Sequence, residues 1–174
     1  AAKVEQAIIL GTPYLGAPQV IWALRSGFKG MNDWTSKIKY LDLAIQTLVQ
    51  NYPSVYQVVP SKRYWDVTAG DWFCKNGSAY DWHELLNLLV REHNLILPLL
   101  AQQLHLVVDD WENLPAGTAF RFIVGSGRED TPGGLREEFR WPWDGGTRWD
   151  IIPTNGDGTV PLASASLQGN GFNY

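Results

Sequence analysis

Two short, mainly apolar runs in this chain have the pattern of β-strands. The first covers residues 7–10 and stops at Gly11, and the second covers residues 118–124 and stops at Gly125. Short continuous runs of this kind are typical of strands that are covered on both faces, as in a parallel sheet. The pattern therefore predicts two buried, parallel strands with about 110 residues between them.

Apolar residues between these strands mostly follow a helical spacing. Residues 18–26 predict a short helix, with a proline at its start and a glycine after its end. Residues 36–50 predict an amphipathic helix, because their apolar side chains fall on one stripe and polar side chains such as Gln46 lie largely off it. The stripe consists of Ile38, Leu41, Ile45, Leu48 and Val49.

A longer, Leu-rich helical region is predicted to begin at Asp81. Asp81 is placed to cap the free N–H groups of the first turn, and Glu84 lies three positions on, as in a capping box. Pro98 is expected to kink or split this region, because proline removes a helical hydrogen bond. The preceding residues 52–72 are aromatic and contain prolines, so they predict a loop with one helical turn.

Near the C-terminus, residues 137–141 and 147–152 flank a Trp-Asp-Gly-Gly run at 143–146. This pattern predicts a β-hairpin, and residues 164–167 predict the start of another helix. Two strands do not make a stable parallel sheet by themselves. We therefore expect an α/β fold in which this chain supplies part of a larger sheet, with a helical insertion between two neighbouring strands.

Composition narrows the class of protein. A chain of 174 residues is long enough for one domain, and its 45% hydrophobic residues are typical of a globular protein. The net charge of −4 argues against nucleic acid as a partner, because phosphate binding needs a basic surface. The single Cys74 excludes an internal disulfide framework. No apolar stretch reaches the roughly 18–20 residues of a transmembrane segment.

Residues 155–161, which read Asn-Gly-Asp-Gly-Thr-Val-Pro, are the strongest candidate for chemistry. They place Asp157 between two glycines, which cost backbone entropy and contribute no packing. One explanation is an Asx turn, in which the carboxylate bonds its own backbone. The other is a catalytic acid that accepts the N–H of a histidine. A calcium loop is excluded, because Pro153 and Ser164 stand where its first and twelfth ligands should be.

The groups that such an acid would serve have no counterpart in the sequence. None of the serines lies in the Gly-x-Ser-x-Gly turn of a serine hydrolase. His83, His93 and His105 all precede Asp157, whereas α/β-hydrolases carry serine, acid and histidine in that order. His83 begins a His-Glu-x-x-Asn run that resembles a zinc-protease motif, but asparagine replaces the second ligand. We therefore predict no metal site and no cofactor, and expect the histidines to be structural or surface residues.

Several segments, taken in order, resemble the lecithin:cholesterol acyltransferase-like lipases and esterases of the α/β-hydrolase superfamily. Residues 8–18 resemble the strand and the Gly-Thr-Pro-x-x-Gly segment that follow the nucleophile helix. Residues 52–61 are similar to a segment of the lid or cap. Residues 122–127 resemble the strand before the acid, and residues 156–165 resemble the acid loop itself.

This resemblance implies an α/β-hydrolase core formed by residues 1–26 and 118–174, with a mostly helical lid or cap insertion at 27–117. It also implies that Asp157 is the triad acid. The aromatic residues expected to contact the substrate are Tyr14, Trp72 and Phe73. The nucleophile elbow, oxyanion loop and catalytic histidine of the family are expected before residue 1 and after residue 174, so we expect the chain alone to be inactive.

The implied activity of the parent protein is ester hydrolysis or acyl transfer. Serine attacks an ester carbonyl, and water or an alcohol then accepts the acyl group. The implied partners are a lipid or other carboxylic ester, and a lipid surface that the protein contacts peripherally. The alternative is a non-catalytic domain that binds carbohydrate or a protein through its aromatic side chains. The Leu-rich helical middle argues against that alternative, since sugar-binding modules are usually rich in strands.

Overall fold

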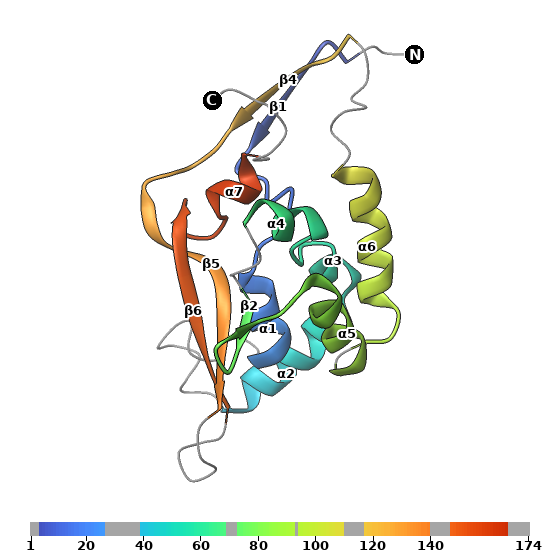
Figure 1. Cartoon of the computed structure of the whole chain (residues 1–174). Coiled ribbons are helices and arrows are strands. Elements are labelled where there is room, and N and C mark those ends of the chain that lie inside the picture. Colours follow the sequence, from blue (N-terminus) through green and yellow to red (C-terminus); the bar gives the residue numbers. More distant parts are fainter. Residues whose placement is uncertain are drawn as a thin grey trace.

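The computed structural model describes residues 4–26, 39–68, 73–92, 94–109, 117–139 and 147–166. Helices and strands are mixed, as the sequence predicts, and the strands form one parallel two-stranded sheet and one mixed four-stranded sheet. In Figure 1, the long hairpin of the second sheet lies on one side of the molecule, and the Leu-rich helices lie on the other. The described part of the chain is therefore of the α/β class.

The first sheet consists of β1 (Gln6–Leu10) and β4 (Ala119–Ile123), which pair in parallel with Gln6 opposite Ala119 and Leu10 opposite Ile123. The parallel pairing confirms the prediction. The prediction that both strands are buried is wrong, because Ile8 is 57% and Leu10 is 67% exposed. Opposed residues of a parallel pair share one face, and within the described residues nothing covers the face that carries Ile8, Leu10 and Ile123.

Six helices lie between these two strands in the described residues. They are α1 (Gln19–Ser26), α2 (Lys39–Gln50), α3 (Pro53–Tyr56), α4 (Lys62–Val67), α5 (Trp82–Glu92) and α6 (Leu97–Val108). The capping box is confirmed: the Glu84 amide donates to Asp81 Oδ1 (2.8 Å), and the Asp81 amide donates to Glu84 Oε2 (2.9 Å). The split at Pro98 is also confirmed, since this residue lies in the first turn of α6.

The predicted apolar stripe of α2 is wrong at Leu48, whose side chain is 62% exposed. The face that meets α1 instead carries two glutamines. The Gln46 side chain donates to the carbonyl of Arg25 (2.6 Å), and that of Gln50 donates to the carbonyl of Leu24 (2.7 Å). The last carbonyls of a helix have no partner within it, so these glutamines satisfy the C-terminal end of α1.

The segment predicted as a loop contains more regular structure. α3 and α4 lie within it, and Ser61 begins α4 by accepting a hydrogen bond from the Tyr64 amide (3.3 Å). A short hairpin of β2 (Phe73–Lys75) and β3 (Ser78–Ala79) follows. Asn76 and Gly77 form its turn with φ of 49° and 81°, a conformation that Asn-Gly adopts readily.

The predicted C-terminal hairpin is confirmed as β5 (Arg128–Phe139) and β6 (Thr147–Gly156), which pair antiparallel. Its predicted turn at 143–146 lies outside the described residues. β2 pairs in parallel with β5, giving the sheet order β3-β2-β5-β6. The insertion predicted at 27–117 therefore shares a sheet with the C-terminal segment. The chain then continues into the short helix α7 (Leu162–Ala165).

One hydrophobic core joins α1, the insertion helices and the second sheet. Its fully buried members include Leu15, Ile21, Leu24, Tyr56, Tyr64, Phe73, Leu85 and Leu135. The Tyr64 hydroxyl donates to the carbonyl of Gly133 (2.9 Å), which links α4 to β5. Burial raises the pKa of Tyr56 to about 12, so its hydroxyl stays protonated while it donates to the carbonyl of Gln50 (2.9 Å).

Within the described residues, no helix has the length and apolar character needed to cross a membrane.

Candidate functional site

Asp157 lies in the loop between β6 and α7, against the carboxyl ends of both parallel strands. Gly11 directly follows β1, and a Cβ placed on it would lie 3.7 Å from Asp157 Oδ2. Gly125 follows β4 by two residues, and a Cβ placed there would lie only 2.6 Å from the Cβ of Asp157. In open α/β sheets, this carboxyl edge is where functional groups collect. The fold thus brings residues 11, 125 and 157 together.

The carboxylate of Asp157 is held by one oxygen only. Oδ1 accepts hydrogen bonds from the amides of Thr159 and Val160, both at 2.8 Å. Among the described residues, none donates to Oδ2, and the residue is exposed to solvent. The Asx turn expected as one explanation is therefore present. It leaves the second oxygen available, so the turn and a catalytic acid are compatible with each other.

The backbone around Asp157 is fixed by the hairpin that precedes it. The Gly158 amide donates to Thr131 Oγ1 (2.8 Å), and Thr131 is completely buried in β5. The Asp157 amide donates to the carbonyl of Val160 (3.3 Å), which closes the loop on itself. Two glycines permit this fold, since a Cβ on Gly156 would collide with that same carbonyl and Gly158 has a φ of +102°.

A second set of contacts ties this loop to the Gly-Thr-Pro segment that follows β1. The Ser164 hydroxyl in α7 donates to the carbonyl of Gly16 at 2.6 Å, and Ser164 is completely buried. Gly16 in turn lies against Pro60, where a Cβ would come within 2.5 Å of the Pro60 Cα. Residues 11–17, 58–61 and 156–165, distant in sequence, thus form one continuous support for Asp157.

An open apolar groove of about 550 Å³ runs beside the Asp157 loop. Its walls come from the Gly-Thr-Pro segment, α1, the end of α2, the segment around α3 and the loop itself. The lining residues are Pro13, Ala17, Gln19, Val20, Ala23, Val49, Ser54, Val55, Val58, Thr159 and Val160. Sequence reasoning missed this groove, because its residues come from several separate segments and are mostly small or apolar side chains without a common motif.

The three residues predicted to contact the substrate have different positions in the structure. Tyr14 lies after β1, and its ring packs edge-on against Phe122 of β4 with centroids 5.7 Å apart. Burial raises the pKa of Tyr14, with a smaller opposing contribution from its hydrogen bond with Thr12. Phe73 is a correction: it is completely buried, packs on Tyr80 and presents no surface to a ligand. Trp72 lies outside the described residues.

The histidines do not complete a triad in the described part of the chain. His83 is exposed on α5, His105 is buried on α6, and neither bonds Asp157; His93 lies outside the described residues. His105 Nδ1 lies 3.0 Å from Asp109 Oδ1, and no described group bonds its Nε2. Across the described ranges, no cluster of three or more histidine, cysteine or carboxylate side chains is placed to hold a metal ion.

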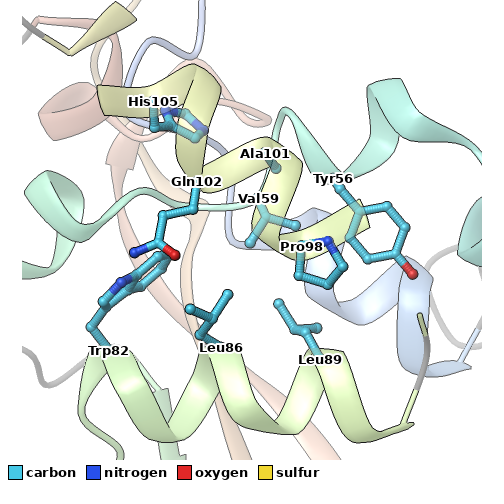
Figure 2. Close-up of a pocket in the computed structure, with 9 residues that line it drawn as sticks. All are labelled: Tyr56, Val59, Trp82, Leu86, Leu89, Pro98, Ala101, Gln102 and His105. Carbon is cyan, nitrogen blue, oxygen red and sulfur yellow. The ribbon is translucent and has the colours of Figure 1, made fainter. Parts of the chain in front are cut away.

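Figure 2 shows His105 beside a small cavity between α5 and α6, which Trp82 and Leu86 line from the opposite helix. The cavity measures about 10 Å³, which is room for no more than about one water molecule. A substrate cannot enter it. The groove beside Asp157, at about 550 Å³, falls within the size range of a ligand site, which typically occupies about 300–1,000 Å³.

Among the aromatic side chains whose exposure the structure describes, Tyr52 is the one that is clearly exposed, at 57%. A flat aromatic platform for sugars needs several such rings side by side.

Comparison with known proteins identifies no family for this chain: no family model matches it, and no curated protein matches it.

Proposed function

We propose that Asp157 is the acid of a Ser-His-Asp triad in an ester hydrolase or acyltransferase of the α/β-hydrolase type. The observation that carries the proposal is the half-bonded carboxylate: Oδ1 is held by two backbone amides, and Oδ2 stays available at the carboxyl ends of β1 and β4. A triad acid needs this combination. It must be rigid, and it must offer one oxygen to the N–H of a histidine.

In this mechanism, Asp157 holds the histidine in the tautomer whose other nitrogen accepts the serine proton. The serine then attacks the ester carbonyl, and the carboxylate stabilises the imidazolium that forms. Water or an alcohol takes the acyl group from the acyl-enzyme in the second half of the reaction. We propose that the serine and the histidine come from parts of the protein beyond this sequence.

The exposed sheet face agrees with that arrangement. Parallel strands occur almost only where both faces are covered, yet Ile8, Leu10 and Ile123 are each more than half exposed. Within the described residues, β1 and β4 pair only with each other, so each has an outer edge open to a further strand. A larger hydrolase sheet would cover this face and extend these edges.

The proposed contact with a lipid surface is supported by α6. A soluble helix normally turns polar residues outward, but four of its outward side chains are apolar, and each is at least 46% exposed. These residues are Leu99, Leu100, Leu106 and Val107. In Figure 1, α6 lies at the outer side of the helical region.

Two neighbouring glycines provide the test. Gly125→Ala would place a methyl group 2.6 Å from the Asp157 Cβ, so the carboxylate must move. A displacement of about 1 Å at a catalytic group costs roughly 100-fold in rate, and we expect this loss in the turnover of a 4-nitrophenyl ester by the full-length protein. The reaction of the serine with a fluorophosphonate, which labels triad-activated serines, should slow by about the same factor in this variant.

Gly127→Ala is the matched control. Nothing lies within 4 Å of its Cβ position, but its φ of +92° disfavours alanine. We expect it to lose about 1–2 kcal/mol of stability in urea unfolding, with turnover by the folded protein within a few-fold of wild type. Wild-type turnover by a folded Gly125→Ala variant, or equal activity losses in both variants, would contradict the proposed role of Asp157.

A further inference from the structure

Two buried polar groups of the helical insertion share the small cavity between α5 and α6. Trp82 on α5 is 6% exposed, and His105 on α6 is 8% exposed. The indole Nε1 of Trp82 and the ring Nε2 of His105 are both shielded from solvent, and no described group bonds either atom. Both side chains line the cavity (Figure 2). Because buried polar atoms of folded proteins almost always have a hydrogen-bond partner, these two nitrogens require one.

The two nitrogens have opposite requirements. An indole N–H can only donate a hydrogen bond. His105 Nδ1 lies 3.0 Å from Asp109 Oδ1, and because an ionised carboxylate only accepts, Nδ1 is the ring nitrogen that carries the proton. In the neutral ring, Nε2 then has a free lone pair and needs a donor. A shared partner must therefore accept from Trp82 and donate to His105 at the same time.

The cavity limits the size of that partner. Its volume of about 10 Å³ corresponds to about one water molecule. A cation would be repelled by the indole N–H, and an anion without a proton has nothing to donate to His105 Nε2. Water is a neutral molecule of the right size that both donates and accepts. The Gln102 side chain lines the same cavity, so it can supply the third hydrogen bond that buried water molecules usually make.

We infer that this cavity binds one internal water molecule, which accepts from Trp82 Nε1 and donates to His105 Nε2, and so joins α5 to α6. The water extends a chain of polar contacts across the insertion. His105 Nδ1 donates to the side chain of Asp109, and the Arg63 side chain of α4 donates to the carbonyl of Asp109 (3.0 Å). One water molecule thus connects three helices. The inference does not depend on the role of Asp157.

The competing partner is the amide of Gln102, which would bond Trp82 or His105 directly. Gln102 is only partly buried, so its amide can also reach solvent, whereas the two ring nitrogens cannot. Figure 2 shows the Gln102 side chain along the wall of the cavity, and the space for a water molecule remains with that side chain in place. Water therefore suits the pair of nitrogens better than the amide.

The test is NMR spectroscopy of the full-length protein with labelled tryptophan and histidine nitrogens, in mildly alkaline solution, where imidazole is neutral. Rotating-frame measurement gives direct contact and chemical exchange with water opposite signs. We expect the indole proton of Trp82 to show direct contact with a long-lived water molecule, and His105 to carry its proton on Nδ1. Lack of that contact would overturn the inference and favour Gln102 as the partner. A proton on Nε2 of His105 would overturn it as well.

Two variants on α6 separate the possible partners. His105→Phe removes the acceptor, so the water contact of Trp82 should disappear. The amides of α5 and α6 should then exchange with solvent about 5- to 30-fold faster, because a buried donor is left unsatisfied. Gln102→Leu is the matched control: it lines the same cavity but leaves both nitrogens, so the water contact and the exchange rates should stay close to wild type.

Either variant can contradict the inference. A water contact that persists in folded His105→Phe would show that His105 does not hold the water. A contact that is lost in folded Gln102→Leu would assign the water to Gln102 instead. The wild-type measurement at Trp82 decides the question even if a variant does not fold.

Discussion

Asp157→Asn is expected to lower the ester turnover of the full-length protein by about 10⁴-fold without loss of the fold. Asparagine retains an oxygen that can accept from the amides of Thr159 and Val160, so the turn survives. It replaces Oδ2 with an NH₂ group, which donates where an acceptor is needed. The histidine is then held in the wrong tautomer, a change that costs about four orders of magnitude in a serine-hydrolase triad. Steady-state kinetics measures the loss of kcat, and a thermal unfolding curve tests whether the fold is retained.

Asp130→Asn is the control for this substitution. Asp130 lies in β5 next to the same loop and is paired with Arg128 at 2.7 Å, a hydrogen bond that lowers the pKa of the Asp130 carboxyl. Exposed pairs of this kind contribute little, so turnover should remain within about twofold of wild type. A folded Asp157→Asn variant that keeps more than a tenth of wild-type kcat would exclude a triad role and leave only the Asx turn.

Of the glycine-to-alanine substitutions that we propose, Gly16→Ala is expected to lower the stability of the protein most. Its φ of +90° disfavours alanine, and the new Cβ would lie 2.5 Å from Pro60 Cα and 2.6 Å from Pro60 N. Backbone atoms cannot swing aside as a side-chain end can. The positive φ and the overpacking together should lower the free energy of unfolding by roughly 2–5 kcal/mol, measured from the urea midpoint.

Gly77→Ala separates these two causes. Gly77 has a similar φ of +81°, but nothing lies within 4 Å of its Cβ position in the β2–β3 turn. Its replacement should lose only the backbone contribution, about 1–2 kcal/mol. The difference between the two variants then measures the contact with Pro60. Equal losses would show that the Gly-Thr-Pro segment does not pack tightly against residues 58–61.

Local signals carried most of the successful predictions of the fold. The start of α5 could be predicted because Asp81 and Glu84 satisfy each other's backbone amides within one turn. The turn at Asn76 and the cap at Ser61 carry local signals of the same kind, so β2–β3 and α4 were also within reach of sequence reasoning. The orientation of α2 was not, because Gln46 is drawn inward by carbonyls of α1, over twenty residues earlier.

The Asx turn at Asp157 could be predicted from its loop, whereas the surroundings of the turn could not. Two flanking glycines mark Asp157 in the sequence. The closeness of Gly125 and Gly11 depends on the pairing of β1 with β4, which no local pattern encodes. Phe73 failed as a ligand contact for a related reason: an aromatic residue looks the same in sequence whether it covers a core or a surface.

The parallel pairing of β1 with β4 also sets the order in which the site can assemble. Gln6 meets Ala119 more than a hundred residues later, so the chain must close a long loop before this sheet gains any stability. The α5–α6 pair and the β5–β6 hairpin close far shorter loops and can form first. Asp157 lies against the ends of these strands, so we expect its contacts with Gly11 and Gly125 to form after the hairpin and to open before it. Amide hydrogen exchange should accordingly be faster in β1 and β4 than in β5.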